Sequence, residues 1–370
     1  MKVVITNCFD TFEDRVDLVH EFFKEQGDEV TVIQSDFRHI KKVYREESKD
    51  DFIFVRSKSY YRNLSVVRLY SHYMFSSSAY KLVEDLKPDL LYTFVPPNSL
   101  AKFAFIYKQK HENVKLIVDL IDLWPETMPI GKVKNFPPFT LWSAMRDNSL
   151  KYADFVITEC DLYQTVLRDV LKDVKVETVY LAKREISVVT NPQLSEDEIH
   201  LAYLGSINNI IDIPKIKDII KAIKEIKPVV LHIIGDGEKK QELINAAKSC
   251  GASVKYYGKI YSPQEKQDIF DKCHFGLNIM KKSVCVGLTM KSVDYFQHGL
   301  PIINNIPADT ANIVEKYGVG INLDNVYELR DYFSTPIDYK GMKNKAKELF
   351  KSMFSIPIYK EKLVKIINNV

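Results

Sequence analysis

The stretch VCVGLTMKSVDYFQHGLPIIN, residues 284–304, predicts a loop, a short helix and a buried strand in direct succession. Thr289 is typical of an N-cap, because its hydroxyl can accept a hydrogen bond from an unpaired amide of the first helical turn. Gly299 suits the left-handed position just after a helix, and Pro301 prevents the helix from continuing. We therefore expect the helix to end before Gly299 and a strand to follow at once over residues 301–304.

The amino end of this predicted helix carries Lys291 and Asp294, which lie three residues apart and hence on one face. Unpaired N–H groups and the positive end of the helix dipole favour a phosphate at such a helix end. Lys291 would add a positive charge, and Asp294 could accept two hydrogen bonds from a vicinal diol such as a ribose. The alternative is a Lys–Asp pair on a solvated surface helix, but the other motifs favour a phosphate site.

Length and composition indicate an ordinary globular protein. The chain has 370 residues, of which 46% are hydrophobic and 27% charged, and this length suits two domains better than one. A net charge of only +3 gives no reason to expect nucleic acid as a partner. The five cysteines show neither a CxxC motif nor the spacing of a zinc site, so we expect free thiols in a reducing compartment.

The amino terminus, MKVVITNCFD, predicts a first strand and lacks the long apolar core of a signal peptide. No window approaches about 18 uninterrupted apolar residues, the length that spans a membrane. We therefore expect a cytoplasmic protein, either free or held peripherally at the cytoplasmic face of a membrane.

Strands and helices alternate along the first half of the chain. Apolar runs predict strands at residues 2–6, 29–33, 51–55, 89–94, 114–120 and 154–158. Helical patterns occupy residues 13–26, 64–86, 99–109 and 141–152. This alternation is typical of βαβ units and a parallel sheet.

A second series repeats the alternation. Strands are predicted at residues 200–205, 229–234, 253–257, 275–279 and 301–304, and helices at 214–226, 238–249 and 263–273. We expect a domain over residues 1–186, a linker over 187–198, a second domain over 199–336, and two helices over 337–370, broken near Ser355, that cross back to the first domain. The fold class is α/β, with two doubly wound Rossmann-like domains facing across a cleft and ligands at the carboxyl ends of the strands.

Two glycine-containing turns follow strands of the second domain. Gly235, Asp236 and Gly237 form a strand-to-helix turn where backbone can approach a ligand closely, although such a turn is more often purely structural. Gly205 and Ser206 leave room and donors for a diphosphate after the domain's first strand, or form a plain loop. GxGxxG is absent after both first strands and no GxxxxGK[ST] occurs, which argues against NAD, FAD and a P-loop.

The segment DLWPE, residues 122–126, is the most unusual pattern of the first half. Asp122 follows a predicted strand and could orient or deprotonate an acceptor hydroxyl. Trp124 and Pro125 make a flat apolar wall suited to a sugar ring, with Glu126 beside it. The alternative is a turn in which Asp122 caps local amides and Trp124 belongs to the core.

Residues 37–73 are rich in basic and aromatic side chains but also contain Glu46, Glu47, Asp50 and Asp51. This segment could rest on anionic lipid headgroups, or it could be an ordinary solvated surface. No nucleic-acid-binding motif accompanies it.

DLWPE and the pattern K-x-x-D-Y-x-x-x-G-L-P-I-I, together with the two α/β domains, resemble bacterial retaining glycosyltransferases of the GT-B fold. The nearest group is family GT4, from capsule, exopolysaccharide and O-antigen pathways. The resemblance covers nearly the whole chain and is most specific over residues 201–323. It implies that the carboxyl-terminal domain binds a nucleotide sugar and the amino-terminal domain binds the acceptor.

Matching positions carry the family's site residues over. Asp294 corresponds to the second acid of the E-x7-E motif, which holds the ribose, and Lys291 and Ser292 lie where the diphosphate rests. The remaining donor contacts implied by the resemblance and by the strand ends are Gly205, Ser206, Gly235, Asp236, Gly258, Lys259, Ile260, Gly287, Leu288, Thr289 and Met290. At the acceptor we expect Asn7, Trp124 and Glu126, with Asp122 and Lys291 as the catalytic residues.

The sequence departs from the family in three places. The first acid of E-x7-E falls at Val286, and residues 7–11 lack the usual glycine pair. The family's Arg and Lys after the phosphate loop have no clear counterpart, Lys215 being the nearest cation. These departures bear mainly on the expected phosphate contacts.

The expected function is retaining, metal-independent transfer of a hexose or N-acetylhexosamine from a nucleotide diphosphate sugar to a lipid-linked or glycan acceptor. The resemblance favours UDP, and no cofactor is expected beyond this co-substrate. The alternatives are a non-catalytic subunit that supports a partner transferase, which Val286 would permit, and a UDP-sugar epimerase of similar fold. Nothing in the sequence indicates an oligomeric state.

Overall fold

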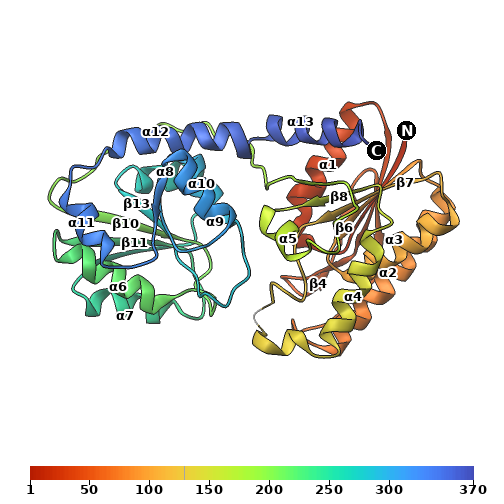
Figure 1. Ribbon diagram of the computed structural model, residues 1–370, viewed down its shortest axis with the longest axis horizontal. Helices are drawn as coiled ribbons and strands as arrows, with labels where there is room; N and C mark the ends of the chain where they lie inside the picture. The colour runs from red at the N-terminus through yellow and green to blue at the C-terminus, as the bar shows by residue number, and fades with distance from the viewer. Residues whose placement is uncertain (129) are drawn as a thin grey trace. The chain divides into compact units, whose positions relative to one another are not determined.

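The computed structural model describes residues 1–128 and 130–370, which form two compact units. Unit 1 contains Met1–Leu181 and Tyr359–Val370, and unit 2 contains Ala182–Ile358. Each unit has its own parallel sheet between layers of helices (Figure 1). The expected α/β fold with two Rossmann-like domains is confirmed.

Within the described residues, the main sheet of unit 1 has seven parallel strands in the order β5-β2-β1-β6-β7-β8-β9. The predicted strands are all present, and the sheet continues to a short edge strand that was not predicted. The strands are β1 (Lys2–Asn7), β2 (Glu29–Ser35), β5 (Phe52–Val55), β6 (Leu90–Val95), β7 (Lys115–Leu120), β8 (Phe155–Thr158) and β9 (Val176–Thr178).

The helices of unit 1 cover both faces of this sheet (Figure 1). They are α1 (Glu13–Glu25), α2 (Val66–Leu86), α3 (Asn98–Lys110), α4 (Phe139–Leu150) and α5 (Asp161–Val166). Phe75 of α2 and Leu100 of α3 belong to the same apolar cluster as Val4 and Leu91 of the sheet. The spacing of the buried residues in α1, α2 and α3 matches the 3.6-residue period from which these helices were predicted.

Sequence periodicity missed the smallest elements of unit 1. These are a hairpin of β3 (Phe37–Arg38) and β4 (Val43–Tyr44), two 3₁₀ turns, η1 (Asp10–Phe12) and η2 (Gly131–Asn135), and the short α5 and β9. Strands of two residues and helices of one or two turns are too short to show a hydrophobic period.

A buried ion pair fixes α1 to the sheet of unit 1. The Arg15 guanidinium donates to both carboxylate oxygens of Asp119 on β7, at 2.9 and 3.0 Å, and the Tyr92 hydroxyl donates to the same carboxylate at 2.6 Å. The Tyr359 ring lies 5.2 Å from the Arg15 guanidinium. Because a buried charge is costly unless it is paired and hydrogen-bonded, this network holds α1 against the sheet of unit 1 and places Tyr359 beside it.

The sheet of unit 2 has the order β12-β11-β10-β13-β14-β15 in the described part of the chain. The first five were predicted, and β15 was not. Their bounds are β10 (Ile199–Leu204), β11 (Val229–Ile234), β12 (Ser253–Gly258), β13 (Phe275–Asn278), β14 (Ile302–Asn304) and β15 (Gly320–Asn322). The helices are α6 (Ile213–Lys224), α7 (Lys240–Ser249), α8 (Pro263–Phe270), α9 (Met290–Gln297), α10 (Asp309–Tyr317), α11 (Glu328–Ser334) and α12 (Tyr339–Leu349).

Residues 284–304 fold as the sequence predicts. The Thr289 hydroxyl caps α9 by accepting from the Ser292 amide at 3.2 Å, and Gly299 has a φ of 68° just beyond the helix end. Strand β14 then begins at Ile302. Helices α8 and α9 cover the face of the sheet opposite α6 and α7 (Figure 1).

The boundary between the units differs from the expected linker at residues 187–198. The division falls between Leu181 and Ala182, and residues 187–198 are hydrogen-bonded within unit 2. The Val189 amide donates to Gln264 of α8 at 2.9 Å, and the Asn191 amide donates to Asp271 at 2.5 Å. Polar composition therefore marked a surface segment that is attached to unit 2.

The carboxyl-terminal helices are broken where the sequence indicates. Helix α12 continues into a π-helical turn, Phe350–Phe354, and α13 (Ile356–Ile367) begins after Ser355. Ser355 forms an isolated bridge with Lys183, whose amide donates to the Phe354 carbonyl at 2.8 Å. Tyr359–Val370 of this tail belong to unit 1.

Candidate functional site

A pocket of about 510 Å³ lies in unit 2 beyond the carboxyl ends of β10 and β13. This is the edge of a doubly wound sheet at which ligands bind. Several predicted donor residues line the pocket together: Gly205, Ser206, Ile260, Thr289, Met290, Lys291 and Asp294.

The amino end of α9 is held in place by a row of strand-end asparagines. Asn278, Asn304 and Asn322 are the last residues of β13, β14 and β15, and their side-chain amides join one another at 2.9 Å across the sheet. The Thr289 hydroxyl donates to Asn278 at 2.9 Å while it accepts from the Ser292 amide. The cap of α9 is therefore fixed by three neighbouring strands.

Lys291 is a buried cation that has no anionic partner among residues 1–128 and 130–370. Its residue is 8% exposed, it lines the pocket, and no hydrogen bond or ion pair joins its ammonium to the described residues. Its Nζ lies 5.2 Å from the centroid of the Tyr203 ring, a cation–π distance. Burial lowers the pKa of Lys291 to about 8. An unpaired ammonium at a helix amino end is chemically suited to hold a phosphate.

Asp294 is paired, but not with Lys291. Its Oδ1 lies 2.5 Å from Nζ of Lys183 and 4.0 Å from Nζ of Lys266, which also lines the pocket. Asp294 Oδ2 accepts no hydrogen bond from the described residues, so it remains available to a diol. The i,i+3 surface pair considered from the sequence is absent from the described structure.

The glycines predicted near the site are also required by the close packing of the backbone around them. A Cβ on Gly235, whose φ is 135°, would lie 2.0 Å from the Gly205 carbonyl oxygen. A Cβ on Gly237 would lie 2.3 Å from the Ile207 carbonyl oxygen. The Gly235 amide donates to the Gly258 carbonyl at 2.7 Å. These close approaches set the shape of the loop that leaves β10 and forms one wall of the pocket.

The other predicted donor residues do not line the pocket. Asp236 binds its neighbours, the Gly237 amide at 2.9 Å and Lys240 at 3.2 Å, and Lys259 is exposed. The Gly287 carbonyl accepts from Thr310, and Leu288 and Ser292 are buried, the latter with its hydroxyl 2.5 Å from that of Thr289. None of these residues is among those that line the pocket.

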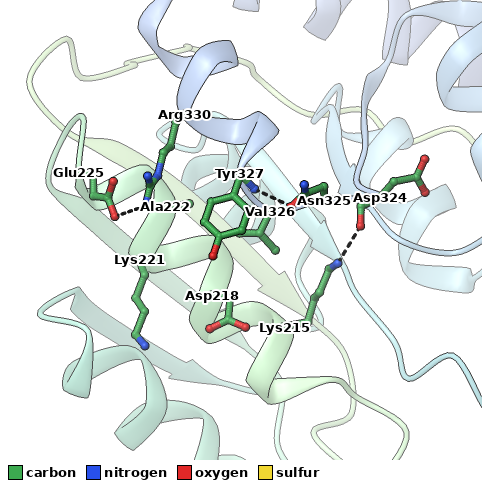
Figure 2. A pocket seen from close by; sticks show the side chains of 10 residues that line it. All are labelled: Lys215, Asp218, Lys221, Ala222, Glu225, Asp324, Asn325, Val326, Tyr327 and Arg330. Atoms are coloured by element: carbon green, nitrogen blue, oxygen red, sulfur yellow. Dashed lines mark hydrogen bonds and ion pairs between the residues drawn. The ribbon is translucent and has the colours of Figure 1, made fainter.

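Lys215 does not line the donor pocket, so it does not replace the Arg or Lys that the GT4 pattern has after the phosphate loop. It lines a separate cavity of about 400 Å³ between α6 and the segment that follows β15, shown in Figure 2. Its ammonium donates to the Asp324 carbonyl at 3.4 Å, and Arg330 pairs with Glu225 at 2.5 Å on the other side (Figure 2). The second cation of the pocket is instead Lys266 of α8, which was not predicted.

In unit 1, Asp122 lies at the carboxyl end of β7 and is held by its own segment. One carboxylate oxygen accepts from the Trp124 indole at 2.7 Å and the other from the Thr127 hydroxyl at 2.6 Å. Burial raises the pKa of Asp122. These hydrogen bonds agree with the alternative interpretation of the segment, in which Asp122 binds groups of its own turn.

The three expected acceptor residues also have partners within unit 1. Trp124 has the Arg68 guanidinium 4.4 Å from its ring centroid, and Glu126 binds Arg146 with both oxygens at 2.9 Å. Asn7 is fully buried, where its side chain bonds both backbone groups of Phe9. The side chains of DLWPE are therefore held by other residues of unit 1 in this structure.

Two classes of feature were not predicted. The asparagine row has a visible signal, because FGLN, IIN and GIN all end in asparagine where a strand stops. Lys183 has no such signal, since its partner Asp294 lies 111 residues further along the chain.

Among residues 1–128 and 130–370, no group of three or more His, Cys, Asp or Glu side chains is suited to hold a metal ion. None of the described helices combines the length and apolarity needed to cross a membrane.

Comparison with known proteins gives one family match and many structural matches. Residues 198–331 match the family described as glycosyl transferases group 1. No curated protein matches the chain in sequence. The matched residues contain β10, β13, α9 and all the residues that line the pocket.

Three solved structures illustrate the structural similarity, each at 12% sequence identity. Sucrose-phosphate synthase from Thermosynechococcus elongatus has a TM-score of 0.69 over 100% of this chain and 98% of its own. Anabaena HepE in complex with UDP and the lipopolysaccharide outer core galactosyltransferase WaaB each have a TM-score of 0.68 over 100% of both chains. At this identity the similarity concerns the fold. The chain has the GT-B fold, and its residues 198–331 match the group 1 glycosyl transferases.

Proposed function

We propose that the protein is a retaining glycosyltransferase of the GT4 type. It transfers a hexose or N-acetylhexosamine from a nucleotide diphosphate sugar, with UDP favoured, to a lipid-linked or glycan acceptor in cell-surface polysaccharide biosynthesis. The observation that carries this proposal is the pocket in which the unpaired Lys291 ammonium lies at the amino end of α9, one helical turn before Asp294. The match of residues 198–331 and the UDP bound in HepE support the same assignment.

In the proposed complex, the diphosphate lies against Lys291 and the first amides of α9, and Lys266 adds a second positive charge. Asp294 accepts from the ribose hydroxyls through Oδ2, while Lys183 holds Oδ1. The loop of Gly205 and Ser206 borders the diphosphate, and Ile260 borders the base. The donor sugar lies near Met290.

Transfer breaks the bond between the anomeric carbon and the diphosphate oxygen and forms a bond from that carbon to the acceptor oxygen. Negative charge develops on the departing diphosphate, so Lys291 and the α9 amides stabilise the transition state more than the ground state. Asp122 is proposed to orient the acceptor hydroxyl and receive its proton. Its raised pKa favours proton binding, and each of its oxygens can accept a further hydrogen bond. No cofactor or metal ion is part of this proposal.

Titration calorimetry with UDP, GDP and dTDP tests the donor site. We expect micromolar binding of UDP, a loss of at least about tenfold for Asp294→Ala, and no change for Glu242→Ala, an exposed acid of α7 outside the pocket. Failure of all three nucleotides to bind would refute the transferase assignment. Equal binding by wild type and Asp294→Ala would refute the ribose role of Asp294.

The second candidate is a non-catalytic subunit of a transferase complex. Val286 favours it, because a valine stands where the GT4 pattern has an acid that contacts the donor. Such a subunit would bind neither UDP nor sugar, so the same titration separates the two functions. We place either protein in the cytoplasm, free or held peripherally at the cytoplasmic face of the membrane.

A further inference from the structure

Three histidines of unit 2 pack together on its sheet, outside the pocket that Lys291 lines. They are His200 of β10, His232 of β11 and His274, which directly precedes β13, and they are 9%, 0% and 1% exposed. The His200 ring centroid lies 5.1 Å from that of His232 and 6.1 Å from that of His274. Strands β11, β10 and β13 are neighbours, so these three residues, called the histidine cluster below, span the centre of the sheet.

The rings of His200 and His232 belong to one chain of hydrogen bonds. Nε2 of His200 lies 3.4 Å from Oε2 of Glu198, Nδ1 of His200 lies 3.0 Å from Nε2 of His232, and Nδ1 of His232 lies 2.9 Å from the Tyr257 hydroxyl. The Glu198 carboxylate only accepts, so His200 donates to it through Nε2 and accepts through Nδ1. His232 then donates through Nε2, and Tyr257 donates to Nδ1 of His232. Each ring therefore carries a single proton, on Nε2.

The backbone fixes the tautomer of the third ring. The His200 amide donates to Nδ1 of His274 at 3.0 Å, and Nε2 of His274 donates to the Ser195 carbonyl at 3.2 Å. An amide N–H cannot become an acceptor, so a proton on Nδ1 of His274 would break the first of these bonds. All three rings are therefore neutral in this structure, and an added proton on any of them displaces a hydrogen bond of the cluster.

Burial disfavours that added proton. It lowers the pKa of His232 to about 3 and the pKa of His274 to about 4, and it also lowers the pKa of His200. A histidine in water has a pKa of about 6.5. The folded cluster thus stays uncharged over a pH range in which the same side chains of an unfolded chain are charged.

The charged groups around the cluster add to this effect. Lys255 of β12 and Lys272, which follows α8, oppose a positive charge on the rings of β10 and β11, and Lys343 of α12 opposes one on the third ring. Glu198 favours a charge on the β10 ring, whereas Asp271 accepts from a glutamine of α8 at 2.7 Å. The other titratable neighbours are uncharged at neutral pH, because burial raises the pKa of each: Tyr257, Cys273 and Tyr339.

We propose that the histidine cluster is an acid-sensitive switch that opens unit 2 when it takes up protons. In the open form each ring is in water and charges below pH 6.5, so the open form binds up to about three more protons than the folded form. The contribution of the cluster to the stability of unit 2 is therefore full above pH 6.5 and is lost as the pH falls towards about 4. Opening also removes the pocket, because Ser206 follows β10 and Lys266 belongs to α8. This inference does not depend on which ligand the pocket binds.

Hydrogen exchange of the full chain without nucleotide, measured by mass spectrometry at pH 7.5, 6.5 and 5.5, tests the switch. Over this range each buried neutral histidine raises the equilibrium constant for opening by about tenfold. The protection factors of β10 and β11, corrected for intrinsic exchange rates, should therefore fall about a hundredfold to a thousandfold. Protection of these strands that stays constant from pH 7.5 to 5.5 would overturn the proposal.

The double substitution His200→Phe with His232→Phe replaces both partners of the hydrogen bond between the two rings with apolar rings of similar size. The pH dependence of protection in β10 and β11 should then be about a hundredfold smaller than in wild type. His111→Phe, at a histidine of unit 1, is the matched control and should leave this pH dependence unchanged. A double variant with the pH dependence of wild type contradicts the switch.

NMR of the wild-type chain with ¹⁵N-labelled histidine decides the matter if the double variant does not fold. We expect all three rings of the cluster to be neutral Nε2–H tautomers at pH 7 and to remain so at pH 5.5 in the folded chain. The assignment is wrong if any of these rings is an Nδ1–H tautomer, or if one titrates near pH 6.5 while unit 2 stays folded.

Discussion

Replacing Lys291 with methionine should weaken donor binding and, at the same time, stabilise the ligand-free protein. Methionine keeps the length and apolar stem of the side chain and removes the charge. In the free protein no described residue pairs with the ammonium, and its burial lowers the pKa of Lys291 from 10.5 to about 8. That difference corresponds to about 3 kcal/mol of unfavourable environment for the charged form.

A bound diphosphate supplies the missing partner and brings the pKa of Lys291 back toward its ordinary value. Wild type should therefore bind UDP up to roughly 100-fold more tightly than Lys291→Met at pH 7. In the absence of UDP, the variant should have a free energy of unfolding higher by about 1–3 kcal/mol, since it no longer buries an unpaired charge. A substitution that lowers the UDP affinity but raises the free energy of unfolding identifies a residue that binds ligand. Loss of a residue that supports the fold would lower the free energy of unfolding.

The pH dependence follows from the same pKa. Below pH 8 Lys291 is charged in the free protein, and UDP affinity should be flat. Between about pH 8 and 10.5 a proton must be taken up on binding, so the dissociation constant should rise about tenfold per pH unit. Over that window the unfolded chain binds more protons than the folded chain, and therefore the stability of the ligand-free protein should increase with pH.

Calorimetry at pH 8.5 in two buffers of different ionisation enthalpy measures the proton uptake directly, and thermal unfolding measures the stability. Lys248→Met is the control, because Lys248 is an exposed lysine of α7 outside the pocket. The reasoning is refuted if UDP affinity is the same at pH 7 and 9.5, if no proton is taken up, or if Lys291→Met is less stable than wild type.

Three further substitutions test neighbouring parts of the structure. Asp294→Asn keeps the shape but weakens the pair with Lys183, and we expect UDP affinity to fall about tenfold in titration while the melting temperature changes little. Thr289→Ala removes the N-cap of α9 and should cost about 1 kcal/mol in urea unfolding, together with a loss of UDP affinity; full affinity would show that the cap does not position the site. Asp119→Ala leaves Arg15 buried and unpaired, so it should cost about 3–5 kcal/mol of stability in unit 1, and an unfolding curve like that of wild type would contradict the buried-pair argument.

The part of the site that could be predicted from sequence is the part whose determinants are local. Thr289 caps a helix through an amide three residues away, and Gly299 ends the same helix, so both signals lie within the segment they define. The strand ends of β10 and β11 could be placed for the same reason, from apolar runs and the glycines that follow them. The fold of unit 2 around the pocket was therefore predictable.

Partners from distant parts of the chain were not predictable. The sequence places Lys291 and Asp294 on one helical face and thereby suggests that they pair. In the structure Asp294 pairs with Lys183, which lies in the segment at the unit boundary, and Lys291 pairs with none of the described residues. Spacing along a helix shows which side chains are neighbours. It does not show whether one of them forms an ion pair with a residue from a distant part of the sequence instead. DLWPE illustrates the opposite case, because the partners of Asp122 lie within five residues of it and the sequence still allowed two interpretations.

The asparagine row explains why a short helix can hold a charged ligand at a fixed place. Helix α9 runs only from Met290 to Gln297, and its first turn would fray if the cap were its only support. Asn278 binds the cap hydroxyl directly, and Asn304 holds Asn278 from the next strand. The positions of the amides that would meet a phosphate are thus set by the sheet. Because an unpaired buried side-chain amide is costly, and a shift of the helix end would break several of these hydrogen bonds at once, the phosphate-binding geometry depends on the whole unit.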